Sequence, residues 1–402
     1  MSNVKWRQMA AGLICMASIS SPQYVWTLFT PALRHDFGVT APALQVTFSI
    51  LIVLQTLFSP VQGWIARHVH PRLLIMSGVL VTGLSWVLAA QASSLGMLYV
   101  TYGGLGGIGT GIVYVGVVVL LMQWFPQNRG MAAGAAAAGY GMGAMLTTFP
   151  IAHLLAASDW RHTLEVFGLA MAAVGMIAAS QLKLPPATIL DDSGQTGLPT
   201  AQVIRTPLFW LMFFMMATMA TSGLMVTSQL AQIAADFGVA QLTVAGMAAL
   251  PLAMTLDRVA NGLTRPLFGW VSDRLGRENT MAFAFTLEAI ALGCWLSLVH
   301  HPVAFVLLSG VIFLGWGEIF SLFPATLTDT FGTRDASRNY GLLYIAQGVG
   351  AVFGGPLAAW MHQAGGSWYP VFACAIGGDL LTALLAYAVL RPMRARFMHT
   401  HG

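Results

Sequence analysis

Arg265 is the side chain of this sequence best suited to bind an anion. It lies within the apolar stretch 242–269. An arginine inside a membrane costs about 3 kcal/mol on insertion scales, so it needs a compensating interaction. Its planar guanidinium matches a carboxylate with two parallel hydrogen bonds. We therefore expect Arg265 to anchor a carboxylate substrate. The alternatives are an internal ion pair and a side chain that extends to the nearby membrane surface.

Three polar residues precede Arg265 in the same stretch. Asn261 lies one helical turn before it and Arg258 seven residues before it, so a helix places Arg258, Asn261 and Arg265 on one stripe. Asn261 would complete the hydrogen bonds of a carboxylate. Asp257 points about 80° away from Arg265 on the helix. It would either carry a proton or form a structural ion pair with Arg258.

Other acidic residues also lie in apolar stretches. Glu318 is interpreted as a proton acceptor or as the partner of Arg265 when no substrate is bound. Glu288 and Asp379 lie in the stretches 280–299 and 369–390. For these two residues, hydrogen bonds between helices are the favoured interpretation.

The composition indicates that membrane helices position these side chains. Only 8% of the 402 residues are charged, 57% are hydrophobic, and the mean hydropathy is +0.73. An average soluble domain carries about 25% charged residues. The composition excludes a secreted domain, a soluble enzyme with one anchor, a disordered chain and a nucleic-acid-binding protein.

Apolar runs long enough to cross a bilayer recur along the whole chain. Because a lipid-exposed backbone must satisfy its own hydrogen bonds, the runs are predicted to be helices, and the fold class is an all-α membrane protein. The twelve predicted transmembrane helices are 9–30, 42–65, 73–92, 97–123, 131–157, 164–183, 208–230, 242–269, 280–299, 303–327, 341–362 and 369–390. Small residues let membrane helices approach closely, so the glycine-rich stretches 103–111 and 130–143 predict tight helix contacts.

The basic residues predict the orientation. With the amino terminus inside, most of the 18 basic residues lie in inside segments, and only Arg34 and Arg161 lie in outside loops. Cytoplasmic loops carry the excess of Lys and Arg. We therefore expect a multi-pass protein of a bacterial inner membrane with both termini in the cytoplasm.

The three cysteines, Cys15, Cys294 and Cys374, all fall in apolar stretches. Their number is odd, and their spacing fits neither a disulfide framework nor a metal site. We expect packing roles for them, no metal and no cofactor.

The chain repeats short motifs at a spacing near 200 residues. The motif Asp36–Val39 recurs as Asp236–Val239, and Gly63-Trp64 recurs as Gly269-Trp270. The repeats predict two pseudo-repeated six-helix bundles of the same orientation, at 1–183 and 208–402. The segment 184–207, with several prolines, glycines and aspartates, is the predicted cytoplasmic linker. Parallel repeats of this kind are typical of alternating-access transporters, whose substrate site lies between the halves.

One loop resembles the signature of the major facilitator superfamily. It runs from Gly269 to Arg277 as Gly-Trp-Val-Ser-Asp-Arg-Leu-Gly-Arg. Its acid would pair with arginines near a helix end and form a latch that breaks as the halves rock. The predicted gating residues are Gly269, Asp273, Arg274, Gly276 and Arg277. The matching loop of the first half, 63–72, lacks the acid and the second glycine.

Further motifs, spread over nearly the whole chain, resemble the oxalate–formate antiporter family, which is related to the monocarboxylate transporters. They include Gln23–Leu28, Gly111–Tyr114, Gly139–Gly141 and Arg338–Gly341. The resemblance implies transport of small carboxylates, with one cation from the eighth helix and one from the eleventh. The first maps onto Arg265. The lysine expected in the eleventh helix is Gln347 here.

The resemblance also implies an aromatic cavity. Rings would enclose the carbon chain of a small acid, and hydroxyl groups would bind its oxygens. The matching residues are Tyr24, Tyr114, Tyr140, Trp316, Phe320 and Tyr344, with Gln23 in the first motif. For any single ring, packing in the core is the alternative.

Charge favours a monocarboxylate. Two unit charges about 4 Å apart attract by roughly 4 kcal/mol at an effective dielectric near 20. Gln347 cannot supply that attraction, so a dianion held by Arg265 would leave one carboxylate without a cation. We predict formate, lactate, pyruvate or a similar acid. An oxalate:formate antiporter is the alternative, because Arg258 would restore the second cation if it turned into the cavity.

The mode of coupling and the class of transported substrate stay open at this stage. Proton symport and anion exchange both fit the sequence. The chain has no metalloprotease, nucleophile-elbow or phosphate-loop motif, so we predict no enzyme and no direct drive by ATP. The predicted partners are small carboxylate anions, protons and the lipid bilayer, for a monomer that binds no nucleic acid. A drug or sugar carrier and a non-transport membrane protein are the other classes.

Overall fold

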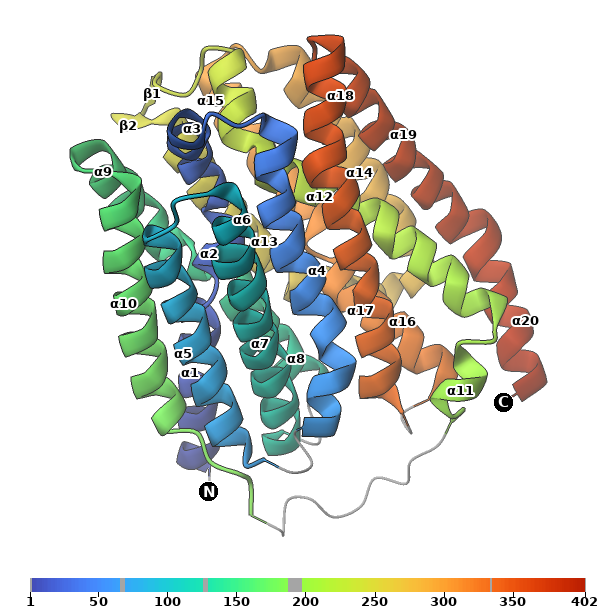
Figure 1. Ribbon diagram of the computed structural model, residues 1–402. Helices are drawn as coiled ribbons and strands as arrows, with labels where there is room; N and C mark the ends of the chain where they lie inside the picture. Colours follow the sequence, from blue (N-terminus) through green and yellow to red (C-terminus); the bar gives the residue numbers. More distant parts are fainter. Residues whose placement is uncertain (1, 66–68, 126–128, 187–196, 333–334, 402) are drawn as a thin grey trace.

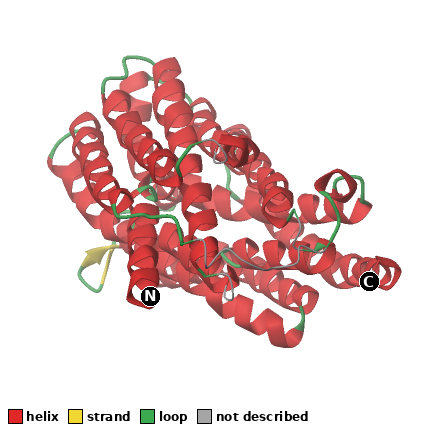
Figure 2. Cartoon of the chain, turned by 90° about the horizontal axis from the view of Figure 1, so that it is seen from below, coloured by secondary structure: helices red, strands yellow, loops and turns green. Residues whose placement is uncertain are grey.

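The computed structural model describes residues 2–65, 69–125, 129–186, 197–332 and 335–401. Long helices run side by side, and both ends of the chain lie at the same end of the bundle (Figure 1). Seen from that end, the described chain is almost entirely helical, with a small hairpin at the periphery (Figure 2). The predicted all-α fold is confirmed.

The first half of the chain folds into helices separated by short breaks. They are α1 (Ser2–Ser18), α2 (Ser21–Tyr24), α3 (Trp26–Phe37), α4 (Ala41–Ile65), α5 (Pro71–Ala90), α6 (Leu95–Leu98), the π-helix η1 (Tyr99–Leu105), α7 (Gly106–Trp124), α8 (Arg129–Gly143), α9 (Met145–Ala157) and α10 (Trp160–Ser180). The predicted first helix, 9–30, is interrupted on both sides of α2. The predicted fifth helix, 131–157, is interrupted at Ala144.

The second half also consists of helices separated by short breaks, with one pair of short strands. Its elements are α11 (Thr200–Val203), α12 (Pro207–Asp236), β1 (Thr243–Val244), β2 (Met247–Ala248), α13 (Ala249–Leu275), α14 (Arg277–Leu298), α15 (Pro302–Trp316), α16 (Ile319–Phe331), α17 (Ala336–Val352), the π-helix η4 (Phe353–Leu357), α18 (Ala358–Gly365), α19 (Tyr369–Leu385), the π-helix η5 (Ala386–Leu390) and α20 (Arg391–His401).

A hairpin corrects one predicted boundary. Strands β1 and β2 pair antiparallel around Ala245 and Gly246, whose φ angles are 51° and 79°. Positive φ at both central residues is the geometry of a tight two-residue hairpin turn. The predicted eighth helix, 242–269, was wrong at its start, because the helix begins at Ala249.

Nine helical segments of the described chain are long and apolar enough to cross a membrane. They match nine of the twelve predicted transmembrane helices. The other three predictions also fall on helices. Two of these are the interrupted first and fifth, and the third is α13, which contains Asp257, Arg258 and Arg265. These three irregular segments carry much of the candidate site.

Glycines allow very close helix contacts. A Cβ atom added to Gly107 would lie 2.4 Å from the carbonyl oxygen of Leu51, and one added to Gly143 would lie 2.5 Å from the Cα atom of Ala17. These distances leave no room for a side chain between α7 and α4 or between α8 and α1. The tight contacts predicted for 103–111 and 130–143 are confirmed at these positions.

The repeated motif forms a repeated structural contact. Trp160, at the start of α10, donates a hydrogen bond of 2.8 Å to Asp36 near the end of α3. Trp368, just before α19, donates one of 2.9 Å to Asp236 at the end of α12. In each half, an aspartate–tryptophan hydrogen bond at equivalent positions therefore connects the end of one helix to the start of another. The duplicated sequence gives a duplicated contact.

Part of the predicted linker, 184–207, packs on the second half. The backbone NH of Leu198 donates to the carbonyl of Phe331 at 2.9 Å, and that of Thr200 donates to the carboxylate of Asp335 at 2.9 Å. Residues 187–196 of this linker lie outside the described residues. The division into bundles at 183 and 208 stays a prediction.

Candidate functional site

The middle of α13 packs directly on the first half of the chain. A Cβ atom added to Gly262 would overlap the side chain of Met142 in α8, at 1.8 Å from its Cγ atom. One added to Gly141 would lie 3.3 Å from Nη2 of Arg265 and 3.4 Å from Oδ1 of Asn261. Glycines on both helices thus make room for this contact, and Arg265 and Asn261 lie at the boundary between the halves.

Arg265 is buried and only partly satisfied. Its Nη2 donates to Oδ1 of Asn261 at 3.1 Å, and its Nε donates to the backbone carbonyl of Asn261 at 3.3 Å. Its Nη1 and the Nδ2 of Asn261 have no partner within the described chain. No ion pair involves Arg265 among the described residues, and its exposure is 2%. Free donors of this kind are costly to bury unless an acceptor binds them.

Arg258 also faces the first half. Its guanidinium carbon lies 4.1 Å from the centre of the Tyr24 ring and 4.3 Å from that of Phe313, a cation–π arrangement on both sides. Its Nε and Nη1 make no hydrogen bond to any described residue. Asp257 is fully buried, and its polar neighbour is Ser309 of α15, in its own half. Within the described residues, no Asp257–Arg258 ion pair is closer than 4 Å.

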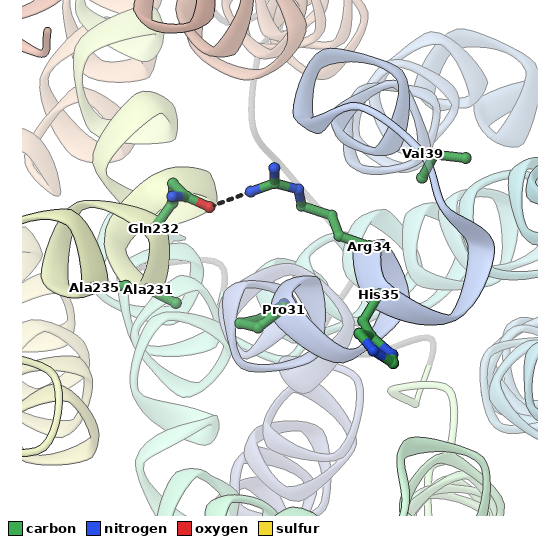
Figure 3. Close-up of a pocket in the computed structure, with 7 residues that line it drawn as sticks. All are labelled: Pro31, Arg34, His35, Val39, Ala231, Gln232 and Ala235. Carbon is green, nitrogen blue, oxygen red and sulfur yellow. Dashed lines mark hydrogen bonds between the residues drawn. The ribbon is translucent and has the colours of Figure 1, made fainter. Parts of the chain in front are cut away.

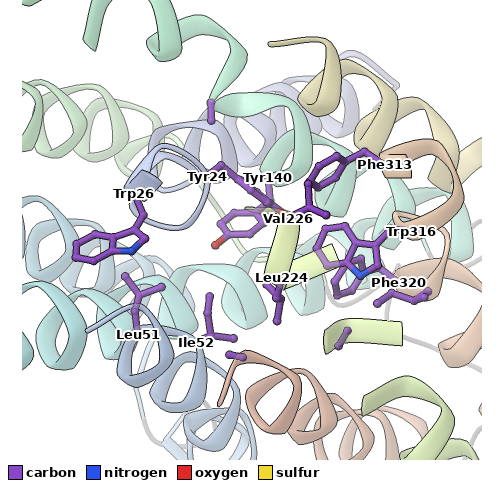
Figure 4. Packing of buried hydrophobic residues seen from close by; sticks show 14 of the residues in the cluster. Tyr24, Trp26, Leu51, Ile52, Tyr140, Leu224, Val226, Phe313, Trp316 and Phe320 are labelled. Carbon is purple, nitrogen blue, oxygen red and sulfur yellow. The ribbon is translucent and has the colours of Figure 1, made fainter. Parts of the chain in front are cut away.

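The six predicted aromatic residues form one continuous row across the two halves. The ring centroids are separated by 5.4 Å for Tyr24–Tyr140, 5.2 Å for Tyr140–Tyr114, 5.6 Å for Tyr114–Tyr344, 6.2 Å for Tyr344–Phe320 and 5.5 Å for Phe320–Trp316. Tyr114 of α7 stacks on Tyr344 of α17 with an angle of 6° between the rings. Several of these rings are seen in Figure 4. Arg258 covers Tyr24, and the Arg265 guanidinium carbon lies 4.5 Å from the Phe320 ring centre.

The breaks in the first half orient the tyrosines. The Ser20 hydroxyl, between α1 and α2, donates to the carbonyl of Tyr140 at 2.6 Å and accepts from the NH of Ala144 at 3.0 Å. It therefore joins the break before α2 to the break between α8 and α9. The Tyr140 hydroxyl donates to Oε1 of Gln23 at 2.8 Å, while Nε2 of Gln23 has no partner among the described residues.

Three acidic residues interact inside the second half. Glu288 of α14, Glu318 between α15 and α16, and Asp379 of α19 are fully buried. Asp379 accepts a hydrogen bond of 3.1 Å from Ser222, as expected for contacts between helices. The carboxylate oxygens of Glu288 and Glu318 have no hydrogen-bond partner in the described part of the chain. Glu318 interacts electrostatically with both Asp379 and Arg265, so this group adjoins the cationic site.

Comparison with known proteins identifies the family. The sequence model of the Major Facilitator Superfamily matches residues 9–256 and 218–397. The chain belongs to the major facilitator superfamily. It is 30% identical over 363 residues to the oxalate:formate antiporter of Oxalobacter formigenes, a match that covers 88% of this chain and 84% of that protein. The predicted membership of the oxalate–formate antiporter family is confirmed.

Other relatives carry transporter names as well. Identity to monocarboxylate transporter 13 of Bos taurus is 25%, over 83% of this chain and 78% of that protein. Identity to the uncharacterized MFS-type transporter YhjX of Escherichia coli (strain K12) is 25%, over 87% of this chain and 86% of that protein. The chain thus belongs with integral membrane transporters and not with enzymes.

The superfamily loop is fixed to its own half in this structure. Arg277 pairs with Asp273 at 2.7 Å and with Asp329 of α16 at 3.0 Å, and it also donates to Ser272. Gly276 separates α13 from α14 with a φ of 87°. Arg274 covers the Trp270 ring at 3.9 Å, and a Cβ on Gly269 would meet open space. The described contacts of this loop stay within the second half, and the latch between the halves stays a prediction.

Three site residues were missed by the sequence reasoning. Phe313 is the second ring against Arg258. Gln55 of α4 accepts from the Tyr140 hydroxyl at 3.4 Å and donates to that of Tyr344 at 3.5 Å. Tyr340 lies 5.7 Å from Tyr344, ring to ring. An amide within an apolar helix was the available signal for Gln55. Gln347, predicted at the site, is buried in α17, and its Oε1 has no partner among the described residues.

Proposed function

We propose that this chain is a secondary active transporter of small carboxylates and that Arg265 anchors the anion. The observation that carries this proposal is a buried guanidinium at the boundary between the halves, whose Nη1 and the neighbouring Nδ2 of Asn261 have no partner among the described residues. A carboxylate supplies the two acceptors that these donors lack. The aromatic row beside them suits the carbon skeleton of a small acid. The names of the relatives support the same substrate class.

A single substitution tests the anchor. We expect Arg265→Ala to weaken carboxylate binding by roughly 100-fold, because charge-assisted hydrogen bonds contribute about 1.5–3 kcal/mol. Binding is measured as the rise in unfolding temperature of purified protein with formate, lactate or pyruvate. Arg274→Ala, in the superfamily loop, is the matched control. Equal stabilisation of the wild type and Arg265→Ala would contradict the proposal.

The position of Arg258 supports a second candidate substrate. The sequence favoured a monocarboxylate because only one cation was assigned to the site. Arg258 packs against Tyr24, and two of its donor nitrogens have no partner in the described part of the chain, so a second guanidinium is available along the same helix. The two residues are seven positions apart, or about 10 Å along the helix axis. A short dicarboxylate such as oxalate is therefore the second candidate.

Arg258→Gln separates the two candidates. If the substrate is a monocarboxylate held by Arg265, lactate binding changes little and oxalate binds the wild type weakly. If Arg258 holds a second carboxylate, oxalate stabilises the wild type more than lactate does, and Arg258→Gln removes that difference. Wild-type protein that oxalate does not stabilise rejects the dicarboxylate candidate.

Coupling to protons is the part of this proposal that concerns Glu318 and Asp257. A carboxyl group in an apolar membrane interior is most stable when it is neutral or paired with a cation. Neither residue has a cation within 4 Å among the described residues. We expect liposomes without internal acid to accumulate substrate when a pH gradient is imposed. Glu318→Gln or Asp257→Asn should remove this accumulation and leave binding intact. Uptake that requires an internal acid would instead support exchange.

The remaining features of the proposal concern the whole protein. We propose a monomer in a bacterial inner membrane, with both termini cytoplasmic and two bundles, 1–183 and 208–402, that rock around the site. A cysteine at His35, which is 92% exposed in its side chain, should react with an impermeant maleimide in intact cells. A cysteine at Asp273 should react only after the membrane is opened. The reverse pattern would invert the orientation.

A further inference from the structure

Arg34 joins the two halves on the face opposite the termini. It lies in α3, and its Nη1 donates a hydrogen bond of 2.5 Å to Oε1 of Gln232 in α12 (Figure 3). Its Nε is buried and has no partner among the described residues. Within the described chain, this guanidinium thus donates only to a neutral amide.

Arg34 and Gln232 are shared by two neighbouring cavities. One has a volume of about 350 Å³ and is lined by Pro31, Arg34, His35, Val39, Ala231, Gln232 and Ala235. The other, of about 150 Å³, is lined by Arg34 and Gln232 together with residues that include His362 and Trp368. Small-molecule sites typically measure about 300–1,000 Å³. The larger cavity therefore has room for a small organic acid beside the guanidinium.

Asp236, the acid that contacts this bridge through Gln232, already has several partners. Asp236 accepts from Nε2 of Gln232 at 2.7 Å, from Nε1 of Trp368 at 2.9 Å, and pairs with Nε2 of His362 at 3.0 Å. All three partners belong to the second half. Gln232 is thus held between Arg34 on one side and Asp236 on the other. Arg34 lines the larger cavity, whereas Asp236 is not among the residues that line it.

A carboxylate is a better partner for Arg34 than Gln232 is. Charge-assisted hydrogen bonds are roughly twice as strong as neutral ones, and a guanidinium donates two parallel hydrogen bonds to a carboxylate, a geometry that one amide oxygen cannot provide. A small carboxylate can therefore compete with Gln232 for Arg34. Competition there breaks a hydrogen bond between α3 and α12, which belong to opposite halves.

We propose that Arg34 and the cavity beside Gln232 form an entry subsite that binds a small carboxylate anion, and that the bound anion displaces Gln232 and loosens this contact between the halves. The subsite deepens the proposed function, on which its role in transport rests, and it is separate from Arg265. Binding at this subsite does not require the central site. In this proposal, binding of the incoming substrate breaks the Arg34–Gln232 hydrogen bond, which otherwise holds α3 and α12 together on the entry side.

Transport kinetics test the role of the subsite in entry. We expect Arg34→Gln to raise the KM for uptake from this face about tenfold and to leave the KM for efflux from the opposite face unchanged. Arg161→Gln is the charge-matched control, because Arg161 lies on the same face but contacts Asp36, Ala90 and Ala92 of its own half. It should shift the KM less than twofold. An unchanged uptake KM in Arg34→Gln, or an equal shift in both variants, overturns the proposed role in entry.

A labelling experiment tests the subsite without transport. Ala235 lines the larger cavity, so a cysteine at this position, in a chain without its three native cysteines and with Arg265→Ala, reports on occupancy through its reaction with a neutral maleimide. Sodium formate should slow the reaction several-fold, and Arg34→Gln should abolish this effect. Protection by sodium chloride at the same concentration, or protection that survives Arg34→Gln, overturns the subsite.

The two experiments separate this inference from the proposed function. Protection of the Ala235→Cys thiol by formate, without carboxylate transport by the wild type, would leave the subsite and reject the transport proposal. Carboxylate transport without protection of the thiol would keep the transport proposal and reject the subsite. Gln232→Glu gives an independent check, because a carboxylate fixed at this position should occupy Arg34 permanently and slow uptake. Uptake by Gln232→Glu at the wild-type rate would contradict the displacement of Gln232.

Discussion

The unpaired nitrogens of Arg265 and Arg258 define what a bound molecule must supply. Both side chains are at most 2% exposed, and both keep donors that no described residue accepts. Buried donors of a cation are stabilised by acceptors and by negative charge. A neutral sugar supplies acceptors but no charge, so the site favours an organic anion over the alternative class of sugar carriers.

The Tyr140 hydroxyl gives a prediction at the scale of one atom. Tyr140→Phe keeps the ring contacts with Tyr24 and Tyr114 and removes the hydrogen bond to Gln23. Because Gln23 would lose its only described partner, we expect a loss of about 1–3 kcal/mol in stability and several-fold weaker carboxylate binding. Thermal unfolding with and without lactate measures both effects. Tyr99→Phe, which loses a hydrogen bond to Ala43, should lower stability alone.

Sequence reasoning singled out side chains that are unusual in a membrane, and their roles at the site stay a prediction. Arg265, Asn261 and Arg258 were predicted because polar residues on one helical stripe in an apolar stretch are conspicuous. Phe313 was missed because a phenylalanine in an apolar helix carries no signal of its own. Its role depends on the path that the Arg258 side chain takes, and no helical spacing within one element gives a contact between α13 and α15.

The element that determines the site is α13, which has two polar faces. Arg258, Asn261 and Arg265 face the first half, whereas Asp257 faces α15. The helical spacing predicted this separation. The helix approaches α8 closely because Gly262 and Gly141 lack side chains. The position of the cations therefore depends on glycines as much as on the arginines.

Glycine contacts give a prediction at the scale of elements. In Gly107→Ala the new methyl group would meet the Leu51 carbonyl, which is backbone and cannot move without shifting α4. We expect a loss of about 1–3 kcal/mol, measured as a lower unfolding temperature in detergent. Gly134→Ala is the matched control, because its methyl group would meet nothing within 4 Å. A larger loss in Gly134→Ala would contradict this account of packing.

Element boundaries were less predictable than element existence. The hairpin before α13 was read as helix, because its residues are as apolar as the helix that follows. The breaks before α2 and at Ala144 were also missed. They depend on Ser20, whose hydroxyl joins two segments more than a hundred positions apart in the sequence. A local pattern contains no information about such a long-range hydrogen bond.

The two halves of the molecule meet along α4 and α17. A Cβ atom on Gly341 would lie 3.8 Å from the Cβ of Ser59, and one on Gly348 would lie 2.5 Å from Oγ1 of Thr56. Farther along, the Ser49 hydroxyl donates to the carbonyl of Ala351 at 2.7 Å. These contacts span residues 49–59 of α4 and 341–351 of α17. A rocking motion must separate them at one end or the other.

The Gly341–Ser59 spacing makes this motion testable. The Cβ–Cβ distance of 3.8 Å between positions 341 and 59 equals the mean found in disulfides, about 3.8 Å. We expect Ser59→Cys with Gly341→Cys, in a chain without its native cysteines, to form a disulfide on oxidation and to stop transport. Reduction should restore the rate, and each single substitution should be insensitive to oxidant. Full transport by the oxidised pair would show that this end of the interface does not open.

The buried charges are distributed very unevenly over the two halves. In the described chain, all strongly buried charged residues belong to the second half, and they are Asp257, Arg258, Arg265, Glu288, Glu318 and Asp379. The first half contributes rings, amides and glycines. Ribosomes make the half without strongly buried charges first, so its helices enter the bilayer before α13 is synthesised. Because the buried charges of α13 would cost several kcal/mol in lipid, we expect this helix to insert against helices of the first half that are already in place.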